Sequence, residues 1–222
     1  MNRTVLIVTR HFMPTPGGLT DHTATLARYF RANRLVPVLI VETAPGSASP
    51  AVDGKWEEIA CHAYSGVTGL YSALHKAIEH HKPQVVLFQY VPHMWGRAGV
   101  APAPSLIPLW VRLRYRIPVV TFLHELYYDW SLNPKRIVLS CAHRLQLRLI
   151  CPASRHLIVT NDKRTKELAQ YRRRLSRIPT GSISGRKRDD LRKSPYSFPY
   201  VVWFGTGASD QRLEELARAF CT

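Results

Sequence analysis

Cysteine is scarce in this sequence, and its cysteines lack the spacing of a metal or redox motif. The 222 residues contain no CxxC pair, and the four cysteines are Cys61, Cys141, Cys151 and Cys221. This excludes a disulfide scaffold or a structural zinc module as the basis of the fold. We expect the thiols to be small core residues of a protein in the reducing cytoplasm.

Long hydrophobic runs are also missing. The longest apolar stretch, residues 100–111, is interrupted by Pro102, Pro104 and Pro108 and is too short to cross a bilayer. The apolar run at 5–8 is brief and soon meets Arg10 and His11, unlike the core of a signal peptide. These absences predict a cytoplasmic protein without a membrane span.

Acidic residues are outnumbered. The chain has 31 Lys and Arg against 15 Asp and Glu, a formal net charge of +16, and residues 111–193 hold 20 of the basic but only 6 of the acidic residues. Charge concentrated in this way predicts an anionic partner: a nucleic acid, an anionic membrane or a phosphorylated small molecule. The alternative is an ordinary solvated basic surface.

Metal-binding motifs are absent as well. No Asp-x-Asp sequence occurs, and Tyr128 stands where a zinc motif beginning at His124-Glu125 would need its second histidine. We therefore expect no metal and no tightly bound cofactor.

The sequence does contain short apolar runs that alternate with segments of helical periodicity. This alternation predicts an α/β fold: an open parallel Rossmann-like sheet with helices on both faces, formed by residues 1–183. The expected strands are 5–8, 36–41, 56–60, 85–90, 119–123, 156–160 and 177–179, and the expected helices are 19–32, 70–80, 105–115, 135–150 and 162–171.

The helix expected at 135–150 has an apolar stripe and a basic face. We expect the stripe to pack inward and the basic side chains to point outward. The stripe consists of Val138, Ala142, Leu145 and Leu149, and the basic residues are Arg136, Arg144 and Arg148.

Residues 184–199 are rich in Gly, Ser, Pro and basic residues and predict a linker. A further apolar run and a helical segment at 200–222 predict the first strand and helix of a second domain. Since a lone strand and helix cannot form a core, the sequence predicts an incomplete second domain.

Gly17-Gly18 separates the first strand from the first helix. A helix N-terminus after a strand directs free N–H groups towards an anion, and glycine allows close approach of a phosphate. We expect Thr20 and Asp21 to cap this helix. The alternative role of the glycine pair is a simple turn.

Ligands of open α/β sheets bind at the carboxyl ends of the strands. This rule brings together three loops that are distant in sequence, 10–18, 91–99 and 124–130. The aromatic and polar content of the last two suits a sugar or another polar ligand.

Four segments of the chain resemble family 4 glycosyltransferases. They are VLIVTRHFMPTPGGLTDHTATLARYF, PVVTFLHELYYDW, RIPTGS and the stretch 200–220, in the order that the family has them. The resemblance implies the N-terminal half of a GT-B fold, in which the first domain holds the acceptor and the second the nucleotide-sugar. It also implies metal-independent, retaining transfer of a sugar to a glycan or lipid-linked acceptor.

The resemblance also implies roles for individual residues. Gly17 and Gly18 would bind the donor diphosphate, His124 would lie near the transferred sugar, and Glu125 would orient His124. The acceptor-side loop residues would be His11, Asp21, Tyr90, Trp95 and Tyr127. The protein would bind the inner surface of the cell membrane through a basic face. This face comprises Arg112, Arg114, Arg136, Arg144 and Arg148.

Two positions depart from the family pattern. Thr206 and about Gln211 stand where the family has an Arg and a Lys on the diphosphate, and the remaining donor site would lie beyond Thr222. We therefore expect a chain that is weakly active or inactive alone, and a separately encoded C-terminal domain is one implied partner.

Three alternatives remain open at this stage. The first is a non-catalytic relic or partner of a glycosyltransferase. The second is a basic nucleic-acid-binding α/β protein, although no recognition signature for nucleic acid is present and none is expected as a partner. The third is an NAD-binding Rossmann protein with Glu42 on the ribose, although the first loop lacks GxGxxG.

Overall fold

The computed structural model describes residues 3–12, 17–42, 54–128 and 132–178, all within the compact unit Met1–Ile183. The expected linker at 184–199 and the expected strand and helix at 200–222 lie outside the described residues.

The described residues form one eight-stranded sheet in the order β3-β4-β2-β1-β5-β6-β7-β8. Every neighbouring pair is parallel except β3 and β4. This confirms the predicted open parallel sheet. The strands are β1 (Arg3–Val8), β2 (Leu35–Glu42), β3 (Gly54–Trp56), β4 (Ile59–Tyr64), β5 (Val85–Tyr90), β6 (Val119–Leu123), β7 (His156–Val159) and β8 (Leu175–Arg177).

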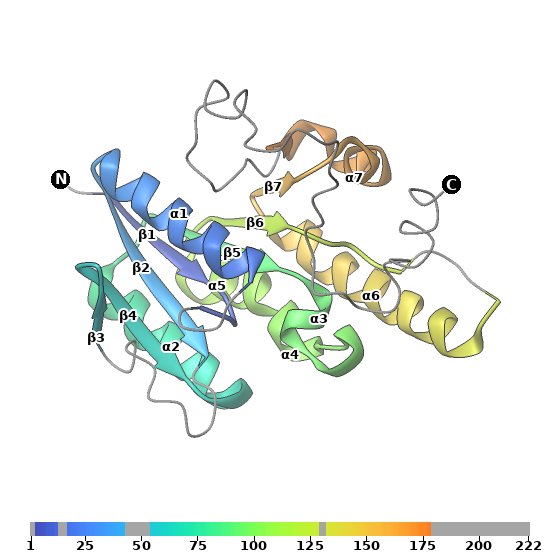
Figure 1. Ribbon diagram of the computed structural model, residues 1–222, viewed down its shortest axis with the longest axis horizontal. Coiled ribbons are helices and arrows are strands. Elements are labelled where there is room, and N and C mark those ends of the chain that lie inside the picture. Colours follow the sequence, from blue (N-terminus) through green and yellow to red (C-terminus); the bar gives the residue numbers. More distant parts are fainter. Residues whose placement is uncertain (1–2, 13–16, 43–53, 129–131, 179–222) are drawn as a thin grey trace, which may run out of the picture. The chain divides into compact units, whose positions relative to one another are not determined.

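Helices cover both faces of this sheet, with α1 on one face and α2, α5 and α6 on the other (Figure 1). Because strand side chains alternate between faces, Ile7 packs against α1 while Leu6 and Val8 join the opposite core. The helices are α1 (Gly18–Ala32), α2 (Gly66–His81), α3 (Pro92–Trp95), α4 (Pro102–Ser105), α5 (Ile107–Tyr115), α6 (Pro134–Ala153) and α7 (Asp162–Glu167). The 3-10 helices are η1 (Arg97–Gly99) and η2 (Ala169–Arg174).

The strand expected at 56–60 is wrong, because this segment is the turn of a hairpin. β3 and β4 pair antiparallel, with Trp56 opposite Ile59. Glu57 and Glu58 form the two-residue connection with φ values of 46° and 66°. Positive φ at both positions is the geometry of a type I′ turn, which usually selects Asn or Gly, so the two glutamates hid the turn from the sequence.

The segment expected as a loop between 91 and 103 instead contains α3, η1 and α4. Pro92 and Pro102 each occupy the beginning of a helix, where a missing N–H costs nothing. The prolines that suggested a loop therefore start short helices.

The stripe expected to face inward on α6 is also wrong. Val138 and Leu145 are 67% and 59% exposed, whereas His143 and Gln146 are 1% and 4% exposed. The buried face of α6 is therefore partly polar.

Of the cysteines, Cys61 and Cys151 are buried as expected, Cys141 is exposed, and Cys221 lies outside the described residues. Among the described helices, none is long and apolar enough to cross a membrane.

Candidate functional site at the carboxyl edge of the sheet

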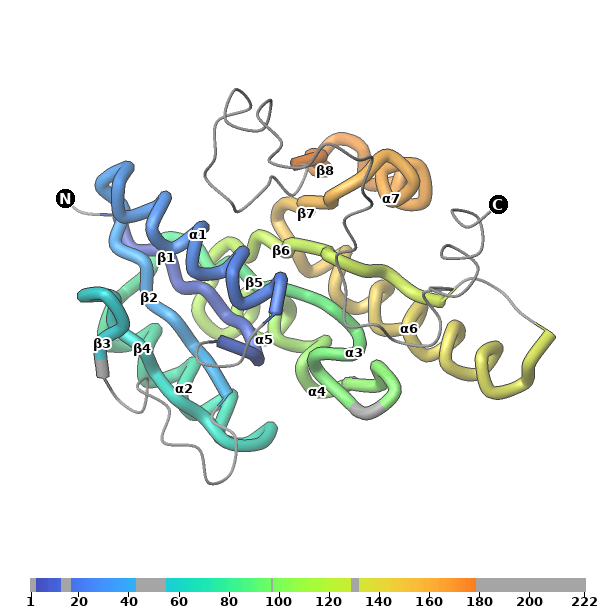
Figure 2. Tube along the Cα trace, viewed as in Figure 1, coloured from blue at the N-terminus to red at the C-terminus, as the bar shows by residue number. Residues whose placement is uncertain are grey.

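The strand order places a switch point between β1 and β5. From β1 the chain continues outward to β2 and then β4, and it returns to β5 on the other side of β1 before continuing to β6 (Figure 2). Connections diverge at such a point, which leaves a crevice at the carboxyl ends of the two central strands. Thr9 follows β1 there, and Val91 follows β5.

Helix α1 begins beside this crevice with Gly17 as its N-cap. The N–H of Asp21 donates to the carbonyl of Gly17 at 3.0 Å. The predicted capping by Thr20 and Asp21 is wrong, because the helix starts earlier and both residues lie within its first turns. Asp21 is exposed on this helix and is not part of a loop.

Packing within the described residues does not explain the glycine pair. A Cβ added to Gly17 or Gly18 would have no described heavy atom within 4 Å. At Gly99, by contrast, a Cβ would lie 2.4 Å from His143 Nε2, so packing alone requires glycine there. The backbone of Gly17 and Gly18 is therefore accessible at the start of α1.

A hydrogen-bond chain connects α1 with His124. Gln89, fully buried on β5, donates from Nε2 to the hydroxyl of Thr23 at 2.8 Å. Thr23 donates to the backbone carbonyl of Leu19, one turn earlier in α1, also at 2.8 Å. Gln89 Oε1 lies 3.1 Å from His124 Nε2. These hydrogen bonds thus join the first turns of α1, the end of β5 and the end of β6.

These partners determine which nitrogen of His124 carries the hydrogen. Since the hydroxyl hydrogen of Thr23 is directed to Leu19, the Thr23 oxygen accepts from the NH2 group of Gln89. The amide oxygen of Gln89 then faces His124 and can only accept, so this assignment gives Nε2 of His124 the hydrogen. Nδ1 remains the nitrogen with a lone pair.

His124 is neutral at physiological pH. Burial, followed by the nearby charges of His22 and Arg164, lowers its pKa from 6.5 to about 3. Its ring stacks on Phe122 with centroids 4.4 Å apart, and His22 meets it edge-on at 4.9 Å. Nε2 of His22 is itself buried and has no hydrogen-bond partner among the described residues. His124 is therefore suited to hydrogen bonding and not to donating a proton as an acid near pH 7.

The predicted orienting residue of His124 differs from the one observed. Glu125 is exposed, and the His124 ring donates from Nε2 to Oε1 of Gln89 on β5. The pKa of His143 is lowered, chiefly by burial, and Glu125 opposes this shift only as the smallest of the four contributions.

The predicted acceptor-side residues lie in different environments. Tyr90 is fully buried and Trp95 is 6% exposed, so both are core residues, and Trp95 donates from Nε1 to the Gln89 carbonyl at 2.8 Å. His11 is exposed after β1. Tyr127 is half-buried, with the guanidinium of Arg144 3.7 Å from its ring centroid.

The buried polar face of α6 holds the loop between β5 and α5. Gln146 accepts from the N–H of Ala101 at 2.6 Å and donates to the carbonyl of Gly99 at 2.9 Å. His143 Nε2 lies 3.1 Å from the carbonyl of Ala98, and Ser140 donates to the carbonyl of Tyr128 at 2.8 Å. These bonds explain why polar residues of α6 face inward.

An aromatic cluster lies between the same loops. The rings of His93, Tyr128 and His143 have centroid distances of 5.0 to 5.7 Å from one another. The His93 and Tyr128 rings are exposed. A sugar ring stacks well on such faces, and the cluster was missed because its members are distant in sequence.

An ion pair lies at the carboxyl ends of β1 and β2. Arg10, just after β1, pairs with Glu42 at the end of β2 and also donates to the carbonyl of Met94 at 2.7 Å. Glu42 is therefore engaged with Arg10, which disfavours its predicted alternative role as a ribose ligand of NAD.

The arginines of the predicted membrane face lie in separate places. Arg112 lines a cavity at the amino edge of the sheet, and Arg144 and Arg148 line another cavity beside α7. Arg114 lies 5.6 Å from the ring centroid of Tyr115, and Arg136 is in the first turn of α6. The described residues contain no cluster of three or more His, Cys, Asp or Glu side chains suited to a metal.

Neither a protein-family model nor a curated protein sequence matches this chain. Among solved structures, it is similar to an alpha-glucosyltransferase in complex with UDP-glucose and DNA containing an abasic site, with 16% identity and a TM-score of 0.47 over 77% of this chain and 39% of that one. An alpha-glucosyltransferase in complex with UDP and a 13-mer DNA with a central A:G mismatch gives 15% identity and a TM-score of 0.45, over 72% of this chain and 37% of that chain.

A third similar structure is dTDP-glucose 4,6-dehydratase from Bacillus anthracis str. Ames in complex with NAD. It shares 12% identity with a TM-score of 0.41, over 71% of this chain and 54% of that chain. The chain thus spans less than two thirds of each of these proteins. Similarities this weak do not decide a function, and the assignment of a Rossmann-like α/β sheet stands on the strand order itself.

Proposed function

We propose that this chain is the acceptor-side domain of a glycosyltransferase of the GT-B type, acting on a nucleotide-sugar. The observation that carries the proposal is the placement of the α1 N-terminus and of His124, joined through Thr23 and Gln89, at one switch point. The resemblance of the four sequence segments to family 4 glycosyltransferases supports the same assignment. The glycan or lipid-linked nature of the acceptor and retention of configuration follow from that resemblance.

In this proposal the first turn of α1 faces the donor diphosphate. When the bond between the anomeric carbon and the diphosphate oxygen breaks, negative charge grows on the leaving group. The N–H groups of Gly18 and Leu19, which have no partner within the helix, and the positive end of the helix would stabilise that charge. The uncovered backbone at Gly17 and Gly18 permits the close approach that this role requires.

His124 would serve as a neutral hydrogen-bond acceptor for a sugar hydroxyl. Its Nε2–H is used on Gln89, and Nδ1 presents the lone pair. A pKa of about 3 keeps the ring uncharged, so it would not compete with the diphosphate for a proton. The exposed rings of His93 and Tyr128 would contact the acceptor.

Replacement of Gly18 by alanine tests this role of α1. We expect Gly18→Ala to preserve the fold, because the new Cβ meets no described atom and alanine favours the helix. The Cβ would nevertheless obstruct the diphosphate, so the dissociation constant for a nucleotide-sugar should rise at least tenfold. Ligand-observed NMR with UDP-, GDP- and ADP-sugars suits the weak binding expected of this chain.

Gly69→Ala is the matched control, because Gly69 lies within α2 and its Cβ would make an ordinary 3.7 Å contact with Tyr64. This variant should bind as the wild type does. Equal binding by the Gly18→Ala variant and the wild type would contradict the diphosphate role, and binding of NAD in preference to every nucleotide-sugar would overturn the proposed function.

A further inference from the structure

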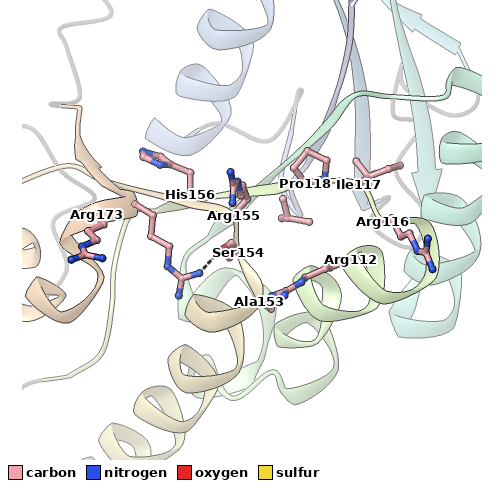
Figure 3. Close-up of a pocket in the computed structure, with 11 residues that line it drawn as sticks. Arg112, Arg116, Ile117, Pro118, Ala153, Ser154, Arg155, His156 and Arg173 are labelled. Atoms are coloured by element: carbon pink, nitrogen blue, oxygen red, sulfur yellow. Dashed lines mark hydrogen bonds between the residues drawn. The ribbon is translucent and has the colours of Figure 1, made fainter.

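A basic cavity lies at the amino-terminal ends of the strands, at the edge of the sheet opposite the candidate site. A cavity of about 550 Å³ is formed where β6 and β7 begin and where α5 and α6 end (Figure 3). Residues of η2 complete its wall. Five arginines line it: Arg112, Arg116, Arg155, Arg173 and Arg174.

This cavity contains no counter-charge from side chains. No Asp or Glu is among its lining residues, and within the described ranges no carboxylate pairs with any of the five arginines. The described ion pairs of the chain use Arg10, Arg28, Lys55 and Arg177 instead. Five positive charges therefore surround one hollow.

Helix termini offset only part of this charge. Arg112 donates to the carbonyl of Pro152 at 3.3 Å, and Arg174 donates to the carbonyls of Pro152 and Ser154 at 3.3 and 2.8 Å. Each helix C-terminus is equivalent to roughly half a negative charge. The two helix ends thus balance about one of the five positive charges, and carbonyls at the end of α6 hold Arg112 and Arg174 in place.

The remaining arginines face the cavity from several elements. In the view of Figure 3, Arg155 lies between Arg173 on one side and Arg112 and Arg116 on the other. Ordinary solvated arginines on one helix would spread over a surface, whereas these come from α5, η2 and the junction of α6 with β7. The fold itself therefore brings the charges together.

We propose that this cavity binds a compact polyphosphate anion with at least two phosphate groups. One guanidinium group can donate two parallel hydrogen bonds to the oxygens of a phosphate. The helix ends leave about four of the five arginine charges unbalanced, and an anion with several phosphates would match them. The volume is in the range of small-ligand pockets. No Phe, Tyr or Trp lines the cavity, so it offers no such aromatic ring on which a nucleic-acid base could stack.

The pair of substitutions Arg155→Gln and Arg173→Gln tests the site in the full chain. Both side chains are exposed, so the double variant should fold. By isothermal titration calorimetry, wild-type protein should bind inorganic tripolyphosphate at least tenfold more tightly than orthophosphate. The double variant should lose at least tenfold in affinity for tripolyphosphate.

Lys135→Gln with Arg136→Gln is the matched control. This variant also removes two positive charges, but at the opposite end of α6, about 27 Å away at a rise of 1.5 Å per helical residue. Its tripolyphosphate affinity should change by less than twofold. Equal losses in the two double variants would show diffuse charge attraction and overturn the proposal, as would the absence of binding by the wild type.

Two further ligands identify the source of the phosphates. ATP should bind no more than tenfold more tightly than tripolyphosphate. A larger preference for ATP would contradict a site that recognises only the phosphate groups. Vesicles with a phosphoinositide bisphosphate that bind the wild type and are displaced by tripolyphosphate would identify a lipid headgroup as the source. Binding of tripolyphosphate without binding of the vesicles would identify a free polyphosphate.

Discussion

The pKa of His124 connects the candidate site with the stability of the domain. In the folded chain this pKa is about 3, lowered first by burial and then by His22 and Arg164, against 6.5 as its ordinary value. Below pH 6.5 the unfolded chain binds a proton that the folded chain rejects. The contribution of His124 to stability is therefore complete above its ordinary pKa and is lost as the pH falls from 6.5 towards 3.

Replacing His124 should weaken this pH dependence. We expect the wild type to lose about 2 kcal/mol more free energy of unfolding than His124→Gln between pH 7.5 and pH 5, from a slope of about 1.4 kcal/mol per pH unit. The glutamine amide can still donate to Gln89. Urea unfolding at the two pH values measures this difference, and equal losses in both proteins would contradict a neutral, partly buried His124.

Gln89 and Thr23 are the members of the hydrogen-bond chain that sequence reasoning missed. Gln89 is the one polar side chain in the strand sequence VVLFQY, and it is fully buried. A buried amide needs partners because an unpaired polar group in a core is costly. That lone polar position in an apolar strand was the available signal, but its partners on α1 and after β6 could be identified only in the folded chain.

At the scale of elements, α6 shows how a helix can bury the face that its sequence pattern does not predict. The exposed side carries Val138 and Leu145, and the buried side carries Ser140, His143 and Gln146. Ser140, Gln146 and Nε2 of His143 hydrogen-bond to backbone atoms of the loops at the carboxyl edge. Hydrogen bonding to those loops thus outweighs the apolar pattern.

Substitutions at two adjacent positions of α6 test this orientation. Gln146→Leu should lower the free energy of unfolding by roughly 1–3 kcal/mol, because the buried N–H of Ala101 and the carbonyl of Gly99 lose their partner. Leu145→Gln should change it by less than about 0.5 kcal/mol at an exposed position. Urea unfolding measures both, and a larger loss in Leu145→Gln would support the inward stripe that the sequence pattern predicted.

At the scale of the whole molecule, charge is concentrated in the second half of the sequence but is divided in space. Residues 111–193 carry most of the excess positive charge. In the described part, arginines of this region line two separate cavities and also occupy the first turn of α6. The linear charge count therefore predicts the strength of anion attraction but not its distribution.

This charge should still produce salt-sensitive binding to anionic membranes. Each basic residue near an anionic bilayer contributes about 1 kcal/mol, so a few suffice for peripheral attachment. We expect the protein to sediment with anionic liposomes at low ionic strength and to be released at high salt. Neutral liposomes are the control, and equal sedimentation with them would contradict electrostatic attachment.

Sequence patterns alone predicted the central strands of the sheet and the edge at which the candidate site residues lie. Apolar runs at 85–90 and 119–123 became β5 and β6, because strands buried on both faces must be apolar throughout. Their alternation with helices predicted a parallel sheet, and a parallel sheet brings the ends of β1, β5 and β6 to one edge. Gly17, Gly18 and His124 could be placed there without coordinates.

The partners at that edge and the arginine-lined cavity at the opposite edge depend on the tertiary structure. The hydrogen bonds of Gln89 and Gln146 and the convergence of Arg112, Arg155 and Arg173 each join elements that are far apart in sequence. Periodicity reports which face of an element is apolar, whereas a polar side chain is buried wherever the fold supplies its partner. Whether such a partner is present depends on how the elements pack together, and a local sequence pattern does not describe that packing.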